Sequence, residues 1–214
     1  MQYKLIIFDF DGTLANTLPW ILSILDEVAD KYKLPHFDRR DLDRVRHLDA
    51  KTLIKQYHIP TWKLPLIARY IHRLQARNIH KLSLFDGAGE VLERLSEAGL
   101  TLALVSSNSR NNVRRILGPA NVARIRYFEC GAAVLGKHGK FKRVLRRAKV
   151  RASEALAIGD ELRDVDAARR VHIPFGAVAW GYTHFETLQA RLPREMFHTM
   201  SEIAERVLAT PRDP

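Results

Sequence analysis

The sequence predicts an α/β fold, with a Rossmann-like parallel sheet as its core and an α-helical segment inserted early in the chain. Two observations support this prediction. After Gly87, short apolar runs alternate with amphipathic helical patterns, as in a parallel sheet that is covered by helices on both faces. Between residues 15 and 82 the alternation is missing, and the pattern is helical.

The first expected strand is a short apolar run over residues 4–10, which ends at an Asp-Gly pair. Helical periodicity then predicts four helices in the insertion, with breaks at Pro35 and Pro60. Their expected ranges are 20–33, 39–47, 52–57 and 63–77. We therefore assign residues 1–14 and 83–214 to the α/β core and residues 15–82 to a helical insertion.

In the second part of the core, strands and helices are expected to alternate. Strands are predicted at 101–106, near 127–128, at 155–158 and at 175–179, with a short edge strand at 196–198. Helices are predicted at 88–98, 112–117, 140–151, 164–171 and 201–208. Gly99 is the expected C-cap of the first of these helices.

Composition places the chain among globular proteins. It has 214 residues, of which 46% are hydrophobic and 28% charged. No apolar run approaches the roughly 18–20 residues that span a bilayer, and the apolar run at 5–8 leads straight into Asp9 and Asp11, unlike a signal peptide. A single cysteine, Cys130, excludes an intrachain disulfide. Together these features predict a cytoplasmic protein with no membrane partner.

The net charge of +11 suits either a nucleic-acid binder or an enzyme that attracts phosphorylated metabolites. Residues 15–82 hold 13 Lys and Arg against seven Asp and Glu, so much of the excess lies in the insertion. The densest basic cluster, at 140–151, carries apolar residues at helical spacing and is typical of an amphipathic helix with a solvated basic face. A nucleic-acid surface is the alternative interpretation of that cluster.

Polar residues follow the predicted strands at the edge where parallel sheets bind ligands. Asp9 and Asp11 are on the same side of an extended chain, and two clustered carboxylates favour a bound hard cation. Gly12 allows the turn that follows them. An ordinary strand-to-turn ending is the alternative explanation of this motif, because Asp-Gly is a common turn pair.

The other two strand ends carry matching chemistry. Ser106, Ser107 and Asn108 offer hydroxyl and amide groups before a helix, which suits a phosphoryl group, although Ser and Asn are also common helix N-caps. Asp160 and Asp164 follow the strand at 155–158, where acids at a helix start are the alternative. Three such strand ends in one sheet together favour a phosphoryl- and metal-binding site over three unrelated helix or turn signals.

The motif Asp9-Phe10-Asp11-Gly12-Thr13-Leu14, with Gly159-Asp160 and Asp164, resembles the haloacid dehalogenase superfamily, in its phosphoglycolate phosphatase-like branch. The resemblance implies a phosphatase in which Asp9 attacks phosphorus and Asp11 is the general acid and base. It implies that Ser106 and Lys137, with Ser107 and Asn108 beside them, bind the phosphoryl group. It also implies a Mg²⁺ site at Asp9, Asp160, Asp164 and the Asp11 backbone carbonyl, beneath a mobile helical cap.

Some assignments stay open at this point. Lys137 is preferred over Lys140 as the phosphate-binding lysine because it places Phe141 at a suitable helical offset. Asn16-Thr17 replaces the Asp-Ser that such phosphatases often have. Glu161 is either near the metal or only a helix-start acid. Trp20 and the segment Trp180-Gly181-Tyr182 either contact substrate or pack in the core.

We therefore expect a magnesium-dependent phosphatase that hydrolyses a small phosphorylated metabolite, such as phosphoglycolate or a sugar phosphate, through an aspartyl-phosphate. A phosphomutase of the same superfamily is the alternative within enzymes. A basic nucleic-acid-binding protein on this scaffold is less favoured, because every expected catalytic position is filled. We expect no nucleic-acid partner, and either a monomer or a homodimer.

Overall fold

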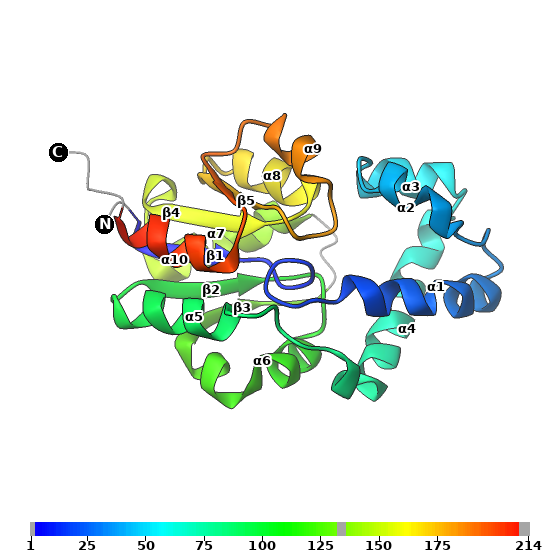
Figure 1. Cartoon of the computed structure of the whole chain (residues 1–214), viewed down its shortest axis with the longest axis horizontal. Coiled ribbons are helices and arrows are strands. Elements are labelled where there is room, and N and C mark those ends of the chain that lie inside the picture. Colours follow the sequence, from blue (N-terminus) through cyan, green and yellow to red (C-terminus); the bar gives the residue numbers. More distant parts are fainter. Residues whose placement is uncertain (1–2, 132–135, 210–214) are drawn as a thin grey trace.

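A computed structural model describes residues 3–131 and 136–209. Its core is a six-stranded sheet with the order β3-β2-β1-β4-β5-β6, in which all neighbouring strands are parallel (Figure 1). The strands are β1 (Leu5–Phe8), β2 (Thr101–Val105), β3 (Ile125–Glu129), β4 (Ala155–Gly159), β5 (Phe175–Val178) and β6 (Glu195–Phe197). The predicted α/β fold is confirmed, and β6 is an edge strand as expected.

Helices cover both faces of the sheet because successive side chains of each strand point to opposite faces. Ile6 and Phe8 of β1 belong to the apolar cluster beneath α5 (Ala88–Glu97), α6 (Arg110–Arg124) and α10 (Met200–Ala209). Leu5 and Ile7 belong to the cluster beneath α7 (Lys137–Ala148), α8 (Leu162–Arg169) and α9 (Phe185–Gln189). β1 is thus buried on both sides, which holds the residues that follow it firmly in place.

The helical insertion contains α1 (Leu18–Tyr32), α2 (Leu42–Val45), α3 (Ala50–Gln56) and α4 (Leu64–Arg77). These helices lie beyond the carboxyl ends of the strands and to one side of the core (Figure 1). The two ends of the insertion are hydrogen-bonded neighbours, with Asn16 N to Ser83 O at 3.0 Å and Phe85 N to Leu14 O at 2.9 Å. The chain therefore leaves the core and returns to it at almost the same point.

The interior of the insertion is apolar and incompletely filled. A cavity of about 410 Å³ lies among α1, α2, α3 and α4, with Leu22, Leu53 and Ile67 in its walls and Tyr182 on the core side. Trp20 belongs to a buried apolar cluster with Ile24 and Leu74, so its side chain is part of the insertion's own core.

The structure corrects several sequence-based boundaries. The basic helix α7 begins at Lys137 and ends at Ala148, so Lys140 is on its buried side rather than its solvated face. Helix α6 extends past the predicted end because the chain resumes helical geometry after a kink at Gly118 and Pro119. Helix α9 was not predicted, since its five residues are too few to show periodicity.

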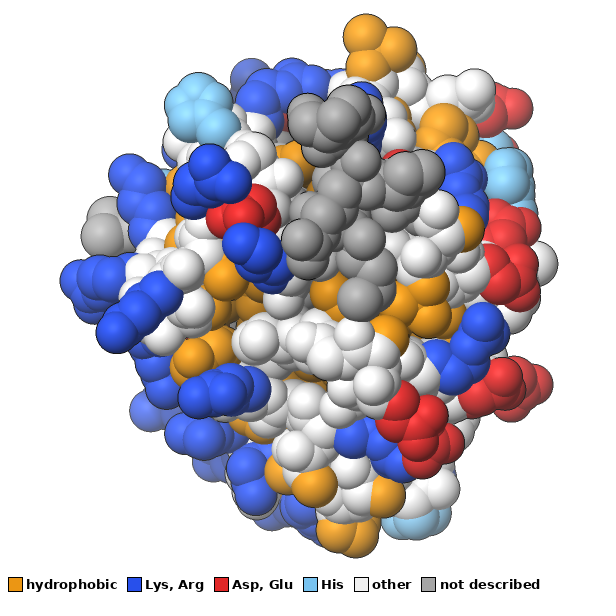
Figure 2. Space-filling model, turned by 90° about the vertical axis from the view of Figure 1, so that its left-hand side faces the viewer, with side chains coloured by type: hydrophobic (Ala, Val, Ile, Leu, Met, Phe, Trp, Pro, Cys, Tyr) orange, Lys and Arg blue, Asp and Glu red, His pale blue; other side chains and the backbone are white. Residues whose placement is uncertain are grey.

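Charge is unevenly distributed over the surface. On the face opposite the insertion, Lys and Arg gather along one side, whereas most Asp and Glu lie along the other (Figure 2). Within the insertion, all the Lys and Arg residues are exposed except Arg46 and Lys63, so its positive charge lies mainly on the outside. No helix in the described part of the chain is long and apolar enough to cross a membrane.

Candidate active site

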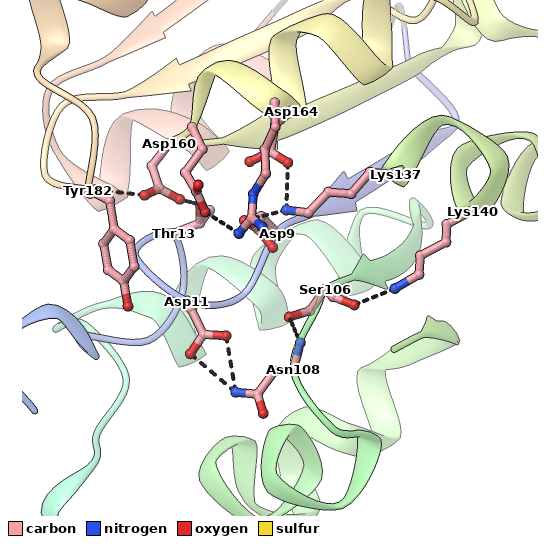
Figure 3. A network of polar contacts seen from close by, with 12 residues as sticks. Asp9, Asp11, Thr13, Ser106, Asn108, Lys137, Lys140, Asp160, Asp164 and Tyr182 are labelled. Atoms are coloured by element: carbon pink, nitrogen blue, oxygen red, sulfur yellow. Dashed lines mark hydrogen bonds and ion pairs between the residues drawn. The ribbon is translucent and has the colours of Figure 1, made fainter. Parts of the chain in front are cut away.

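Three neighbouring strands end in the polar residues that the sequence singled out. Asp9 follows β1, Ser106 follows β2, and Asp160 follows β4, and these strands lie side by side in the sheet. Figure 3 shows their side chains converging with those of Asp164 and Lys137. The predicted residues thus come together at one edge of the sheet.

A group of three buried carboxylates forms the centre of this region. Asp9, Asp160 and Asp164 each offer an oxygen, and the three oxygens lie within 4.8 Å of one another. Asp160 is held in place by the Thr13 hydroxyl and by the backbone N–H of Tyr182, each at 2.7 Å. Asp164 projects from the first turn of α8 and is 2% exposed.

Lys137 provides a positive charge beside these acids. Its Nζ lies 2.7 Å from Asp9 Oδ2 and 2.5 Å from Asp164 Oδ1 (Figure 3). Burial alone would lower the pKa of Lys137, but the negative charges of Asp164 and Asp9 outweigh burial and hold the pKa above its ordinary value. Lys137 is therefore charged at neutral pH.

Lys140, the alternative lysine, has different partners. Its Nζ donates to the backbone carbonyls of Ser106, at 2.6 Å, and Gly131. Burial lowers the pKa of Lys140 to about 8. The side chain thus ties the end of β2 to the loop after β3, while Lys137 is the lysine beside the carboxylates.

The cluster of Asp9, Asp160 and Asp164 suits a hard divalent cation. Burial is the main reason that the pKa of Asp160 is raised well above its ordinary value and that of Asp164 to about 7, and neighbouring negative charges add to both shifts. Asp164 Oδ2 is buried and has no hydrogen-bond donor within the described residues. Three clustered carboxylates, one of them with an oxygen that lacks a donor, offer the oxygen ligands that Mg²⁺ or Ca²⁺ prefers.

The Asp11 carboxylate is separate from this group and has its own partners. Asn108 Nδ2 donates to its Oδ2 at 3.0 Å and to its Oδ1 at 3.2 Å, and Gln75 of α4 lies 3.5 Å from Oδ1. Asn112 in turn donates to Gln75 Oε1 at 3.0 Å. Burial and the negative charge of Asp9 raise the pKa of Asp11 to about 6, although the Asn108 hydrogen bond opposes the shift.

The loop after β2 offers polar groups opposite Asp9. Ser106 Oγ accepts a hydrogen bond from Asn108 N at 3.0 Å, and both residues are buried. Ser109 caps α6 through its hydroxyl, so the capping role that the sequence left open belongs to Ser109. Ser107 is half-buried and lies, with Lys137, along a hollow of about 310 Å³.

Two glycines allow the backbone to approach Asp160 closely. Gly12 has φ of +79°, and a Cβ there would overlap the Asp160 carboxylate. A Cβ at Gly181 would overlap the same side chain. Gly12 is therefore required both for conformation and for space, and Gly181 for space.

Sequence reasoning missed several contacts that support the site. Thr13 lies inside the opening motif, but nothing in its spacing shows that its hydroxyl holds Asp160. Tyr182 contacts Thr17 through their two hydroxyls at 2.6 Å, and Gln75 reaches the site from the insertion. Trp180 packs at the main core and donates from Nε1 to Thr13 O at 3.0 Å, while Glu161 pairs with Arg163. The packing interpretation of Trp180 and the helix-start interpretation of Glu161 agree with these contacts.

Comparison with known proteins places the chain in a family. A family model described as haloacid dehalogenase-like hydrolase matches residues 6–178. The chain belongs to this family. The recognition from the opening motif is thus confirmed, and so is the prediction of a hydrolase of the phosphatase type.

Related proteins align with most of this chain and with most of their own length. The chain is 29% identical to a phosphoglycolate phosphatase of Synechococcus elongatus, over 94% of this chain and 96% of the relative. It is 26% identical to an N-acetylmuramic acid 6-phosphate phosphatase of Pseudomonas aeruginosa, over 87% of this chain and 86% of the relative. A solved haloacid dehalogenase-like hydrolase from Streptococcus pneumoniae has the same fold, with a TM-score of 0.80, 18% identity, and coverage of 96% and 99%.

Proposed function

We propose that the protein is a magnesium-dependent phosphatase that hydrolyses a small phosphorylated metabolite through an aspartyl-phosphate at Asp9. The observation that carries the proposal is the placement of two carboxylates with different partners. Asp9 is ion-paired with Lys137 beside the buried acids, whereas Asp11, two residues further on, faces Asn108. One carboxylate is thus placed to attack and the other to exchange protons.

The chemistry divides between these two residues. An Asp9 carboxylate oxygen attacks phosphorus and forms an acyl-phosphate, while the bond from phosphorus to the leaving oxygen breaks and Asp11 gives that oxygen a proton. Asp11 then takes a proton from the water that attacks the acyl-phosphate, which releases inorganic phosphate and restores the Asp9 carboxylate. Asp11 suits both steps because a pKa of about 6 lies near neutral pH.

Other residues would bind the phosphoryl group and the metal. Lys137, Ser106, and the neighbouring Ser107 and Asn108 would hold phosphoryl oxygens. Asp9, Asp160 and Asp164, with the Asp11 backbone carbonyl, would hold Mg²⁺, which when bound reduces the repulsion between the attacking carboxylate and the anionic phosphate. Thr13 and the Tyr182 N–H keep Asp160 oriented.

The substrate is proposed to be phosphoglycolate-like or a sugar phosphate, with residues 15–82 acting as a cap that selects it. Support comes from the named activities of the relatives and from Gln75, which reaches Asp11 from the insertion. A phosphomutase would use the same residues but return the phosphoryl group to another hydroxyl. Release of inorganic phosphate, rather than an isomeric phosphate, from candidate sugar phosphates distinguishes the two activities.

The experiment that tests the mechanism compares Asp9→Asn and Asp11→Asn with Asp86→Asn, an exposed aspartate just before α5. We expect Asp9→Asn to abolish turnover with an unchanged circular dichroism spectrum. Asp11→Asn should be slow and should accumulate a phosphorylated protein that intact mass spectrometry detects, while Asp86→Asn keeps wild-type rates. Near-normal turnover by Asp9→Asn would refute the mechanism.

A further inference from the structure

A second polar cluster lies where the insertion meets the loop after β5. Asp43 of α2, His47 just beyond α2 and His184 at the start of α9 each offer one ligand atom, and the three atoms lie within 4.8 Å of one another. We propose that this Asp-His-His cluster is a further metal site, for a transition ion such as Zn²⁺, that joins the helical insertion to the core.

The donor set differs from that around Asp9. Two imidazoles and one carboxylate suit Zn²⁺, Ni²⁺ or Cu²⁺, whereas Mg²⁺ prefers a set of oxygens. Three protein ligands leave a fourth position for water, which is a common arrangement around zinc. Asp43 and His47 are exposed, so an ion can reach the cluster from solvent.

The two imidazoles lie beside each other, and a hydrogen bond orients one of them. His47 Nδ1 lies 2.7 Å from the Thr187 hydroxyl, which leaves Nε2 for an ion, as in many metal sites where a hydrogen bond orients the ligating ring. The rings of His47 and His184 stack with centroids 4.4 Å apart, so one ring must turn before nitrogens of both can face the same ion. His184 Nδ1 is buried and has no hydrogen-bond partner among the described residues, a cost that a metal ion would remove.

The surrounding contacts show what such an ion would hold together. Arg46, next to His47, donates to the carbonyls of Tyr182 at 3.1 Å and Gly181 at 3.0 Å. The Arg46 carbonyl accepts from His184 N at 2.8 Å. Because the Tyr182 N–H also binds Asp160, the proposed site fixes α2 to the loop that supports the carboxylates.

The test is Zn²⁺ titration of the whole protein in saturating Mg²⁺, which keeps the oxygen site occupied, using a competing chromophoric chelator. We expect one tight Zn²⁺ per chain, with affinity reduced at least tenfold in His47→Ala and in His184→Ala, and reduced in Asp43→Asn. The control is His80→Ala, which replaces an exposed histidine near the C-terminal end of the insertion. This variant should bind Zn²⁺ like the wild type.

Two further measurements distinguish the proposed Zn²⁺ site from the oxygen site around Asp9. Asp9→Asn should retain the tight site, which separates it from the site of the proposed phosphatase chemistry. Zn²⁺ should raise the melting temperature of the wild type but not of the His47→Ala/His184→Ala double variant. The Asp43→Asn and His47→Ala changes lie on exposed side chains, so both variants should fold. Equal Zn²⁺ affinity in wild type and both histidine variants would overturn the proposal.

Discussion

Asn108 Nδ2 donates hydrogen bonds to both carboxylate oxygens of Asp11, at 3.2 and 3.0 Å. These bonds favour the ionised carboxylate, whereas burial and the charge of Asp9 favour the protonated acid. The proton affinity of Asp11 is therefore set by a balance in which Asn108, a residue from the next strand end, is the main opposing partner.

Replacing Asn108 should shift that balance in a measurable direction. In Asn108→Leu the carboxylate loses the donor that contacts both of its oxygens, so we expect the pKa of Asp11 to rise by about one unit. If protonated Asp11 starts the reaction, the alkaline limb of the kcat/KM profile should move to higher pH. Asn121→Leu, which changes an asparagine hydrogen-bonded within α6, should leave the limb in place. A limb that moves to lower pH would contradict the assignment.

The buried acids should also make stability depend on pH when Mg²⁺ is removed. The pKa values of Asp11 and Asp164, about 6 and about 7, exceed the ordinary 3.8. The folded protein therefore holds protons that the unfolded chain releases, and these two residues lower the free energy of unfolding as pH rises from about 4 to 7.

Urea denaturation in EDTA can isolate this contribution. Relative to wild type, Asp11→Asn should gain roughly 1–3 kcal/mol of stability between pH 4 and pH 7. Excess Mg²⁺ should restore much of the wild-type loss at pH 7, and EDTA should abolish turnover. A pH-independent difference between the two proteins would argue against the raised pKa of Asp11. Full activity in EDTA would argue against a metal site at Asp9, Asp160 and Asp164.

The sequence predicted the sheet and the residues at its edge because both depend on local patterns. Strand ends after apolar runs place Asp9, Ser106 and Asp160 together whatever the details of the loops. The supporting contacts could not be predicted in this way. Thr13 and Asp160 are separated by 147 positions, and Gln75 reaches Asp11 only through the packing of α4 against the core.

The structure gives the two candidate lysines different partners. Lys137 and Lys140 are three residues apart and therefore lie on the same side of a helix, so periodicity alone separates them poorly. The start of α7 at Lys137 places one beside Asp9 and the other beneath the loop carbonyls.

Exchanging each lysine should therefore give different results. Lys137→Met should reduce kcat/KM at least 100-fold, because phosphate and Asp9 lose their nearest cation. Lys140→Met should mainly destabilise the fold, by roughly 1–3 kcal/mol, since two carbonyls lose a charged donor. Steady-state kinetics and urea denaturation of both variants measure the difference. The opposite ranking in kcat/KM would transfer the phosphate-binding role to Lys140.

The adjacent ends of the insertion allow a direct test of its role. Because Asn16 and Ser83 are hydrogen-bonded, a short linker can replace residues 15–82 without moving the core strands. We expect the shortened protein to keep activity on an aryl phosphate and to lose discrimination among metabolites. If it kept the substrate ranking of the whole chain, specificity would lie in the core.

The charge of the insertion gives a further prediction for the whole protein. Its exposed Lys and Arg should attract an anionic substrate over long distances, so kcat/KM should fall with salt where encounter is limiting, since the Debye length shrinks from about 10 Å at 0.1 M to about 3 Å at 1 M. Stopped-flow or steady-state kinetics over this range measure the effect. A flat salt profile would mean that the basic surface serves another partner, and nucleic acid would be the first to test.

The apolar cavity among α1, α2, α3 and α4 has a consequence for the response to hydrostatic pressure. The pocket of about 410 Å³ is only partly open to solvent, and unfolding lets water reach its shielded apolar part, so the volume of the system decreases and pressure favours the unfolded insertion. The sheet, whose strands are buried on both faces, should withstand higher pressure. Trp20 is buried in the insertion and Trp180 packs at the core, so fluorescence of single-tryptophan variants can follow the two regions separately. Filling part of the pocket with Leu53→Phe should raise the pressure at which the Trp20 signal changes.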